Sequence, residues 1–210
     1  MISNSTHSNM LISPARSIIG KVELYNGSTL LNTFQHTDAL SSFTVSRAGD
    51  KKFFGFGVCQ EIEVKLIDRE RAINITKDQN LKVSFVANNN TVSPTPRFYV
   101  SEVMRDENTN ELTIKAYDII HKTKSHTVSE LNLVAPYTIA DVVSKIIGLL
   151  GVSVNYDTIT RDAFNTEYPT GGNFDGTETL REVLDDIAEA TQTIYFMNYS
   201  NNLTFKHLKK

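Results

Sequence analysis

Residues 61–66 have the sequence Glu-Ile-Glu-Val-Lys-Leu, in which charged and apolar side chains alternate without exception. Successive side chains of a strand point to opposite faces, so Ile62, Val64 and Leu66 share one face and the charged residues share the other. Such a strand is typical of an antiparallel sheet with one face on a core and the other toward solvent or a partner. The stretch therefore predicts that the chain around it is β-structure.

Turn signals on both sides of this strand predict further antiparallel strands. Asn26-Gly27 separates the apolar residues Val22 and Leu24 from Leu30, and it predicts a hairpin, because both turn positions would need positive φ. The other predicted strands cover residues 43–46, 81–86, 97–104 and 111–119. Roughly six or seven short strands with turns at short intervals favour a barrel or a sandwich.

The pattern becomes helical in the last third of the chain. From Thr138 apolar residues recur at helical spacing up to Leu150, and Gly151 follows as a C-cap. A second helix is predicted over residues 178–191, because Thr179-x-x-Glu182 forms a capping box before an apolar stripe. A short hairpin through residues 194–205 follows it.

These elements predict an α+β fold in which an N-terminal antiparallel β-barrel precedes a small α+β domain of two helices and a short hairpin. The boundaries that we expect are a flexible N-terminus over residues 1–16, the β-barrel over 17–122, a linker over 123–136 and the α+β domain over 137–210.

Composition excludes several classes of protein. The 210 residues contain 21 Lys and Arg against 24 Asp and Glu, and a net charge of −3 argues against a general nucleic-acid binder. A single cysteine, Cys59, excludes an intramolecular disulfide and a cysteine-rich zinc site. The most apolar window, Val142 to Val154, is one helix long and contains Lys145, so we expect no membrane insertion.

No motif for catalysis, for a cofactor or for a metal stands out. The five histidines lack metal-ligand spacing, and Cys59 has no histidine nearby, so we expect an inert, packed thiol. Asp118, His121 and Ser125 are close in sequence, which does not make a triad. The carboxylates of the second helix lie opposite its apolar stripe, which predicts a solvated face: they are Glu178, Glu182, Asp185, Asp186 and Glu189.

One aromatic and glycine run is unusual. Residues 53–57 are Phe-Phe-Gly-Phe-Gly, and three phenylalanines in four positions cannot all point into one core from a single strand. Either the glycines form a bulge that redirects a ring, or one ring is offered to a partner. We predict this run as a subunit interface made by Phe53, Phe54, Gly55, Phe56 and Gly57.

Two segments resemble the baseplate hub proteins, also called tail-associated structural proteins, at the tail tip of bacteriophages and prophages. The first comprises Ser17–Val22 and then Lys52–Val58 running into Glu61–Asp68. The second is Thr179–Thr191, followed by an aromatic strand and a polar turn. Together the segments cover most of residues 17–208. The resemblance implies a tail-tube-like β-barrel followed by an α+β domain.

The resemblance also implies a structural, non-enzymatic role. Three hub subunits would form a ring under the distal tail protein and contact tape-measure, fibre or spike proteins, while DNA passes through without specific binding. The protein would assemble in the host cytoplasm and remain at the tail tip of the virion. Hubs usually carry a second barrel-like domain, whereas this chain stops at Lys210, so we expect either a fragment or a short gene.

Two other functions stay open. A tail-associated enzyme module that degrades the cell wall would have to use helix carboxylates such as Glu182 and Asp186. A small single-stranded nucleic-acid-binding β-barrel would use Phe53, Phe54 and Phe56 as stacking platforms.

Overall fold

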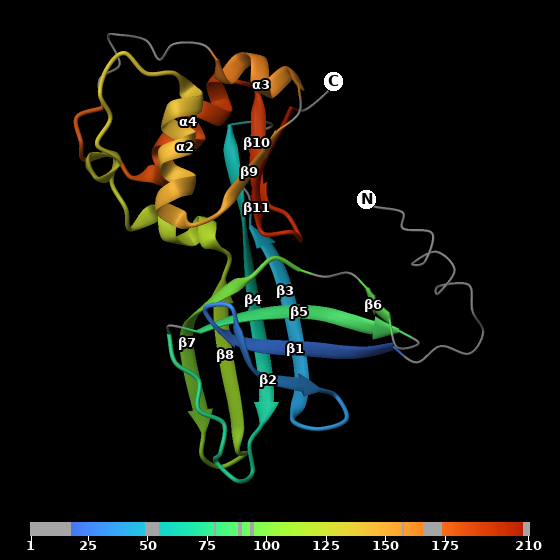
Figure 1. The fold of residues 1–210 in the computed structure, drawn as a ribbon. Helices are drawn as coiled ribbons and strands as arrows, with labels where there is room; N and C mark the ends of the chain where they lie inside the picture. The colour runs from blue at the N-terminus through green and yellow to red at the C-terminus, as the bar shows by residue number, and fades with distance from the viewer. Residues whose placement is uncertain are drawn as a thin grey trace. The chain divides into compact units, whose positions relative to one another are not determined.

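The computed structural model describes residues 18–48, 55–77, 79–87, 90–92, 95–156, 158–165 and 174–207. The chain divides into two compact units (Figure 1). Unit 1 comprises Met1–Ser46 and Glu61–Ala116, and unit 2 comprises Arg47–Gln60 and Tyr117–Lys210. The N-terminal segment 1–16, which the sequence predicts to be flexible, lies outside the described residues.

Unit 1 is built from antiparallel strands, and β4 extends through both units. The strands are β1 (Ile18–Asn26), β2 (Thr29–Gln35), β3 (Leu40–Ala48), β4 (Phe56–Ile67), β5 (Gln79–Ala87), β6 (Asn90–Val92), β7 (Phe98–Asp106) and β8 (Glu111–Tyr117). Their order is β2-β1-β5-β7-β8-β4, with β3 paired to β4 and β6 paired to β5. The β-structure predicted around residues 61–66 is thereby confirmed.

The core of unit 1 follows the alternation seen in the sequence. Ile62, Val64 and Leu66 are fully buried, and Val22 lies opposite Val83 in the register of β1 and β5. Each such side chain contributes about 1.5–3 kcal/mol when removed from water. The other face of β4 is polar, and its Lys65 pairs with Glu111 of β8 at 2.9 Å.

The first hairpin forms, but its turn lies one residue later than predicted. Asn26 pairs with Thr29, so the two loop residues are Gly27 and Ser28. Gly27 has φ of +56°, whereas Asn26 is the last residue of β1. A two-residue turn with glycine first needs one positive φ at that position, which leaves asparagine free to extend the strand.

The strand pairing does not close the sheet of unit 1. One end of the order is β2, the other end is β4 with its neighbour β3, and no pair between β2 and β3 occurs among the described strands. The prediction of a mixed α+β fold is confirmed, whereas the closed barrel is not.

In its described residues, unit 2 combines a small sheet with three α-helices and two 3₁₀ helices. Its strands are the first residues of β4, then β9 (Ser153–Tyr156), β10 (Thr193–Met197) and β11 (Asn202–His207), in the order β4-β10-β11-β9. Its helices are α2 (Ile139–Leu150), α3 (Thr158–Phe164) and α4 (Leu180–Ala190), which pack beside this sheet (Figure 1).

The two long helices begin at the residues that the sequence indicates. Thr138 and Thr179 are the N-caps of α2 and α4, and each closes a capping box, with Asp141 and Glu182 respectively. Gly151 ends α2 with φ of +66°. The predicted helices and the C-terminal hairpin of β10 and β11 are confirmed, while α3 is an additional short helix.

The stretch predicted as a linker contains ordered turns. The 3₁₀ helices η1 (Ile119–Lys124) and η2 (Val128–Leu131) occupy most of residues 119–131. Thr123, Val128 and Leu131 are buried, and both turns are part of unit 2. The polar composition reflects side chains that cap the turns, such as Glu130, which accepts hydrogen bonds from Thr127 and His126.

Candidate functional site

The predicted Phe53–Gly57 interface lies partly within the described residues. Phe53 and Phe54 lie outside them, while Gly55, Phe56 and Gly57 lead into β4 in unit 2. Phe56 is half-buried and pairs with Ile194 in the parallel register of β4 and β10. The interface itself stays a prediction.

Both glycines of this run meet side chains of α4 and β10 at close range. Gly55 has φ of +76°, and a Cβ added there would lie 2.9 Å from the Cα of Glu189. A Cβ on Gly57 would lie 2.7 Å from Oη of Tyr195 and closer still to Cε2 and Cζ. The glycines are thus explained by packing inside unit 2.

A polar cluster made by Arg181, Asp185 and Tyr195 surrounds Gly57. One oxygen of Asp185, Oδ1, accepts hydrogen bonds from the Tyr195 hydroxyl at 2.6 Å and from the Gly57 N–H at 3.1 Å. Arg181 donates to Oδ2 of Asp185 at 3.2 Å and to the Gly57 carbonyl at 2.7 Å. These bonds satisfy both backbone groups of Gly57 and connect the start of β4 to α4.

The Asp185 contacts correct the prediction of a wholly solvated acidic face on α4. Its side chain is only partly exposed, and the guanidinium of Arg181 lies 5.2 Å from the centre of the Tyr195 ring. Burial raises the pKa of Tyr195 well above its ordinary value. The charge of Arg181 opposes this rise, and the Asp185 carboxylate adds to it. Tyr195 therefore acts as a neutral hydrogen-bond donor.

Two other carboxylates of this segment accept hydrogen bonds from backbone N–H groups near the start of α4, as expected of acidic residues at a helix N-terminus. Glu182 accepts from the backbone N–H and the hydroxyl of Thr179, at 2.7 and 2.9 Å, and these bonds lower its pKa. Glu178 accepts from the N–H groups of Asp175 and Gly176. Asp186 is exposed. Glycoside hydrolysis needs one carboxyl with a raised pKa, and the lowered pKa of Glu182 is the opposite.

A second polar cluster is centred on the buried carboxylate of Asp118, directly after β8. Oδ2 accepts from the Gln60 N–H at 2.8 Å, and Oδ1 accepts from the Ile120 N–H at 3.1 Å and from the Cys59 thiol at 3.4 Å. The Asp118 N–H donates in turn to the Gln60 carbonyl at 2.9 Å. Asp118 therefore starts η1 and holds it to β4.

Burial determines how the acids of this cluster ionise. It raises the pKa of Asp118 to about 6, although the hydrogen bonds from Gln60, Cys59 and Ile120 and the charge of Arg181 oppose the rise. Burial and the nearby Asp118 charge raise the pKa of Cys59 to about 12. A thiol with so high a pKa is a poor nucleophile, which agrees with the expectation of an inert, packed cysteine.

We expect the Asp118 carboxyl to titrate near pH 6 in a carbon-13 NMR experiment on the folded protein. Because an unfolded aspartate titrates near pH ~3.9, the folded state takes up the proton first. The free energy of unfolding of the parent protein, relative to that of Asp118→Asn, should therefore rise as the pH falls from 7 to 4. A midpoint below pH 4, or a difference that shrinks on acidification, would contradict this assignment.

The histidines within the described residues do not gather into a metal centre. His7 lies outside the described residues, His36 contacts the Leu40 carbonyl, and His126 pairs with Glu130. His121 is stacked on Tyr117 and does not join Asp118 and Ser125 in a triad, because Asp118 is buried whereas His121 and Ser125 are exposed. Within the described ranges, no group of three or more His, Cys, Asp or Glu side chains could hold a metal ion.

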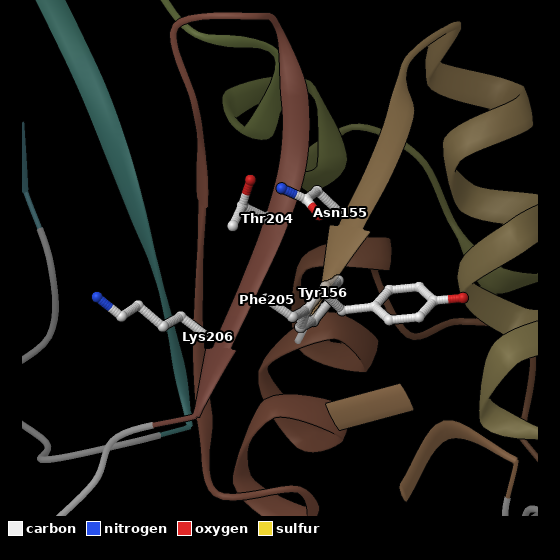
Figure 2. A pocket seen from close by; sticks show the side chains of 5 residues that line it. All are labelled: Asn155, Tyr156, Thr204, Phe205 and Lys206. Carbon is white, nitrogen blue, oxygen red and sulfur yellow. The ribbon is translucent and has the colours of Figure 1, made fainter. Parts of the chain in front are cut away.

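A hollow of about 300 Å³ lies at the β9 and β11 edge of unit 2. Figure 2 shows its five lining residues, with Tyr156 and Phe205 pointing to one side of the sheet and Thr204 and Lys206 to the other. Tyr156 and Phe205 both contact Phe164, at ring distances of 5.4 and 5.0 Å. The rings thus belong to the apolar packing under the sheet, and the hollow brings together no reactive set of side chains.

No family model and no curated protein matches the chain. Among solved structures, by contrast, several tail proteins have a similar fold. The 43 kDa tail protein of prophage MuSo2 from Shewanella oneidensis aligns with a TM-score of 0.60 at 13% identity, over 90% of this chain and 53% of its own. This chain has the fold of a phage tail protein.

Two further tail proteins show the same likeness. The tail protein of Neisseria meningitidis MC58 aligns with a TM-score of 0.58 at 12% identity, over 89% of this chain and 51% of its own. The prophage tail protein gp18 of Listeria monocytogenes EGD-e aligns with a TM-score of 0.52 at 14% identity, over 91% and 51%. This chain spans about half the length of the three tail proteins.

Sequence reasoning missed both polar clusters, because their partners come from distant parts of the chain. Gly57 and Asp185 are 128 residues apart, and Gln60 and Asp118 are 58 apart. The signal that could have indicated the first cluster is the Gly-x-Gly spacing, since glycine in a strand often marks a close approach by another group.

None of the helices in the described part of the chain has the length and apolar character needed to cross a bilayer.

Proposed function

We propose that this chain is a non-enzymatic structural component of a phage or prophage tail, placed in the baseplate hub at the tail tip. The observation that carries the proposal is the fold shared with three tail proteins over 89 to 91% of the chain. The order of the two hub-like sequence segments supports the hub position. In that position the protein would lie under the distal tail protein, at the end of the tail tube.

The proposed role assigns a task to each part of the chain. Unit 1 would form part of the tube-like wall, and unit 2 would be the α+β domain that faces neighbouring proteins. The partners would be the distal tail protein, further copies of this chain in a trimer, and tape-measure, fibre or spike proteins. The Phe53–Gly57 run is the proposed subunit contact.

The buried polar clusters and the net charge support a structural role. The polar side chains of Asp118, Asp185 and Arg181 make hydrogen bonds within unit 2, so they fix secondary elements to one another. A net charge of −3 suits a channel that lets DNA pass without holding its phosphates, because tight phosphate binding needs an excess of lysine and arginine.

Immuno-electron microscopy of induced tailed particles tests this proposal. With an antibody raised against the purified chain, we expect gold label at the distal tip of the tail. Mass spectrometry of the same purified particles provides the control for hidden epitopes, since peptides are detected whether or not the epitopes are accessible. Particles that contain no peptide of this chain would refute a virion role, and label along the tail shaft would refute the hub position.

A further inference from the structure

Among the described strands of unit 1, three have a neighbour on one side only: β2, β3 and the three-residue β6. Among the described strands, β2 pairs with β1 alone and β3 pairs with β4 alone. A strand at the edge of a sheet presents unpaired N–H and C=O groups, which is a template for pairing with another chain. Apart from the short β6, the described part of unit 1 therefore offers two different free edges: the seven residues of β2 and residues 40–46 of β3.

The charges of unit 1 are distributed in an unusual way. Natural edge strands usually carry charged residues or proline, which discourage pairing. Here the inner strands carry the charges, as in the pairs Lys21–Glu23, Lys65–Glu111 and Lys115–Glu102. By contrast, Thr29–Gln35 of β2 and residues 40–46 of β3 contain no charged residue and no proline.

Exposed apolar side chains lie on the β2 edge, and exposed uncharged polar side chains lie on the β3 edge. Leu30 and Leu31 at the start of β2 are each 49% exposed. On β3, the polar side chains of Ser41, Ser42 and Thr44 are exposed, and they offer no repulsion to an incoming uncharged strand. Covering β2 would bury the two leucines, while covering residues 40–46 of β3 would bury no charge, since the exposed Arg47 follows that stretch.

We propose that β2 of one copy pairs edge to edge with β3 of a second copy of this chain. A pair of β2 with β2 would leave both β3 edges uncovered, whereas β2 with β3 covers both kinds of edge in every subunit. Such a contact is heterologous, so it repeats from copy to copy and ends only when a ring closes. The inference deepens the proposed function, because it names the surface through which the copies in a hub meet.

Charge substitution in the purified full chain tests the pairing. We expect sedimentation equilibrium to show self-association that Leu31→Lys and Ser42→Lys each weaken by about tenfold or more, since each places a charge at the edge. The matched control is Leu149→Lys on α2, a leucine that is 43% exposed in unit 2, and it should leave association unchanged. A parent chain that stays monomeric, or an equal effect of all three variants, would overturn the proposal.

Cross-linking identifies which strands meet. A short bismaleimide should join Leu31→Cys to Ser42→Cys when the two variants are mixed, but should join neither variant to itself. Leu31→Cys mixed with Leu149→Cys controls for random collision, and the parent chain controls for reaction at Cys59. A product from Leu31→Cys alone would show that β2 pairs with β2 and would overturn the head-to-tail arrangement.

These outcomes are separable from those of the tail experiment. A chain found at the tail tip whose edges do not cross-link would refute the strand pairing and leave the hub role intact. A chain that cross-links as expected but is absent from tail particles would refute the hub role and leave the pairing intact.

Discussion

Replacing Asp185 with alanine should lower the free energy of unfolding of unit 2 by about 2 kcal/mol. The Asp185 carboxylate is the acceptor for the Tyr195 hydroxyl and the Gly57 N–H, and it pairs with Arg181. Tyr195 is fully buried, whereas the Asp185 side chain is 35% exposed, so water can replace part of the hydrogen bonding that the hydroxyl loses. A buried donor without a partner costs about 1–3 kcal/mol, while the partly exposed pair with Arg181 adds at most about 1 kcal/mol.

Chemical denaturation followed by circular dichroism measures this effect. The matched control is Asp162→Ala, because Asp162 lies exposed on α3 in the same unit, and its removal should change stability by less than about 0.5 kcal/mol. Tyr195→Phe removes the hydroxyl donor but keeps the ring, so it should cost less than Asp185→Ala. If Asp185→Ala and Asp162→Ala were equally mild, the cluster would have no stabilising role.

The Gly57→Ala substitution should be similarly destabilising, by about 3 kcal/mol, through steric overlap. The added Cβ would lie 2.7 Å from Oη of Tyr195 and closer to two ring carbons. The ring cannot move away cheaply, because its hydroxyl is bonded to Asp185 and its face packs near Phe205 at 5.6 Å. The parallel pairing of β4 with β10 should therefore be disrupted.

Gly148→Ala is the matched control for this substitution. Gly148 lies inside α2, and a Cβ added there would meet no atom within 4 Å. Alanine is favoured over glycine in a helix by about 0.5–1 kcal/mol, so Gly148→Ala should raise stability while Gly57→Ala lowers it. The overlap with Tyr195 is tested by Gly57→Ala in a Tyr195→Leu background, where the cost should shrink. An unchanged cost would show that the ring is not its cause.

Local sequence patterns predicted much of the secondary structure. The alternation in residues 61–66 located β4, the apolar spacing from Thr138 to Leu150 located α2, and the capping box at Thr179 located α4, because these signals depend only on neighbours in the sequence. The hairpin turn was predicted one residue early, because Asn-Gly suits a turn with two positive φ values whereas this turn has glycine first. The seven-residue α3 was missed, since it is too short to show a periodic pattern.

The buried clusters could not be predicted from the sequence in the same way. Asp185 has the spacing of a solvated helix residue with one local partner, Arg181, and its other partners, Gly57 and Tyr195, are brought to it only by the fold. For residues 53–57, the sequence left two alternatives: a bulge that redirects a phenylalanine ring, or a ring exposed for contact with a partner. The structure explains Gly55 by its positive φ and Gly57 by the nearby ring, while the rings of Phe53 and Phe54 lie outside the described residues.

The division of β4 between the units bears on the order in which a ribosome could complete them. Unit 1 needs no residue beyond Ala116, so it can fold while the rest of the chain is still being translated. The first residues of β4 must wait for their neighbour β10, which begins at Thr193. Unit 2 is therefore finished last, and a nascent chain stalled before Thr193 would leave Phe56 to Val58 without their parallel strand.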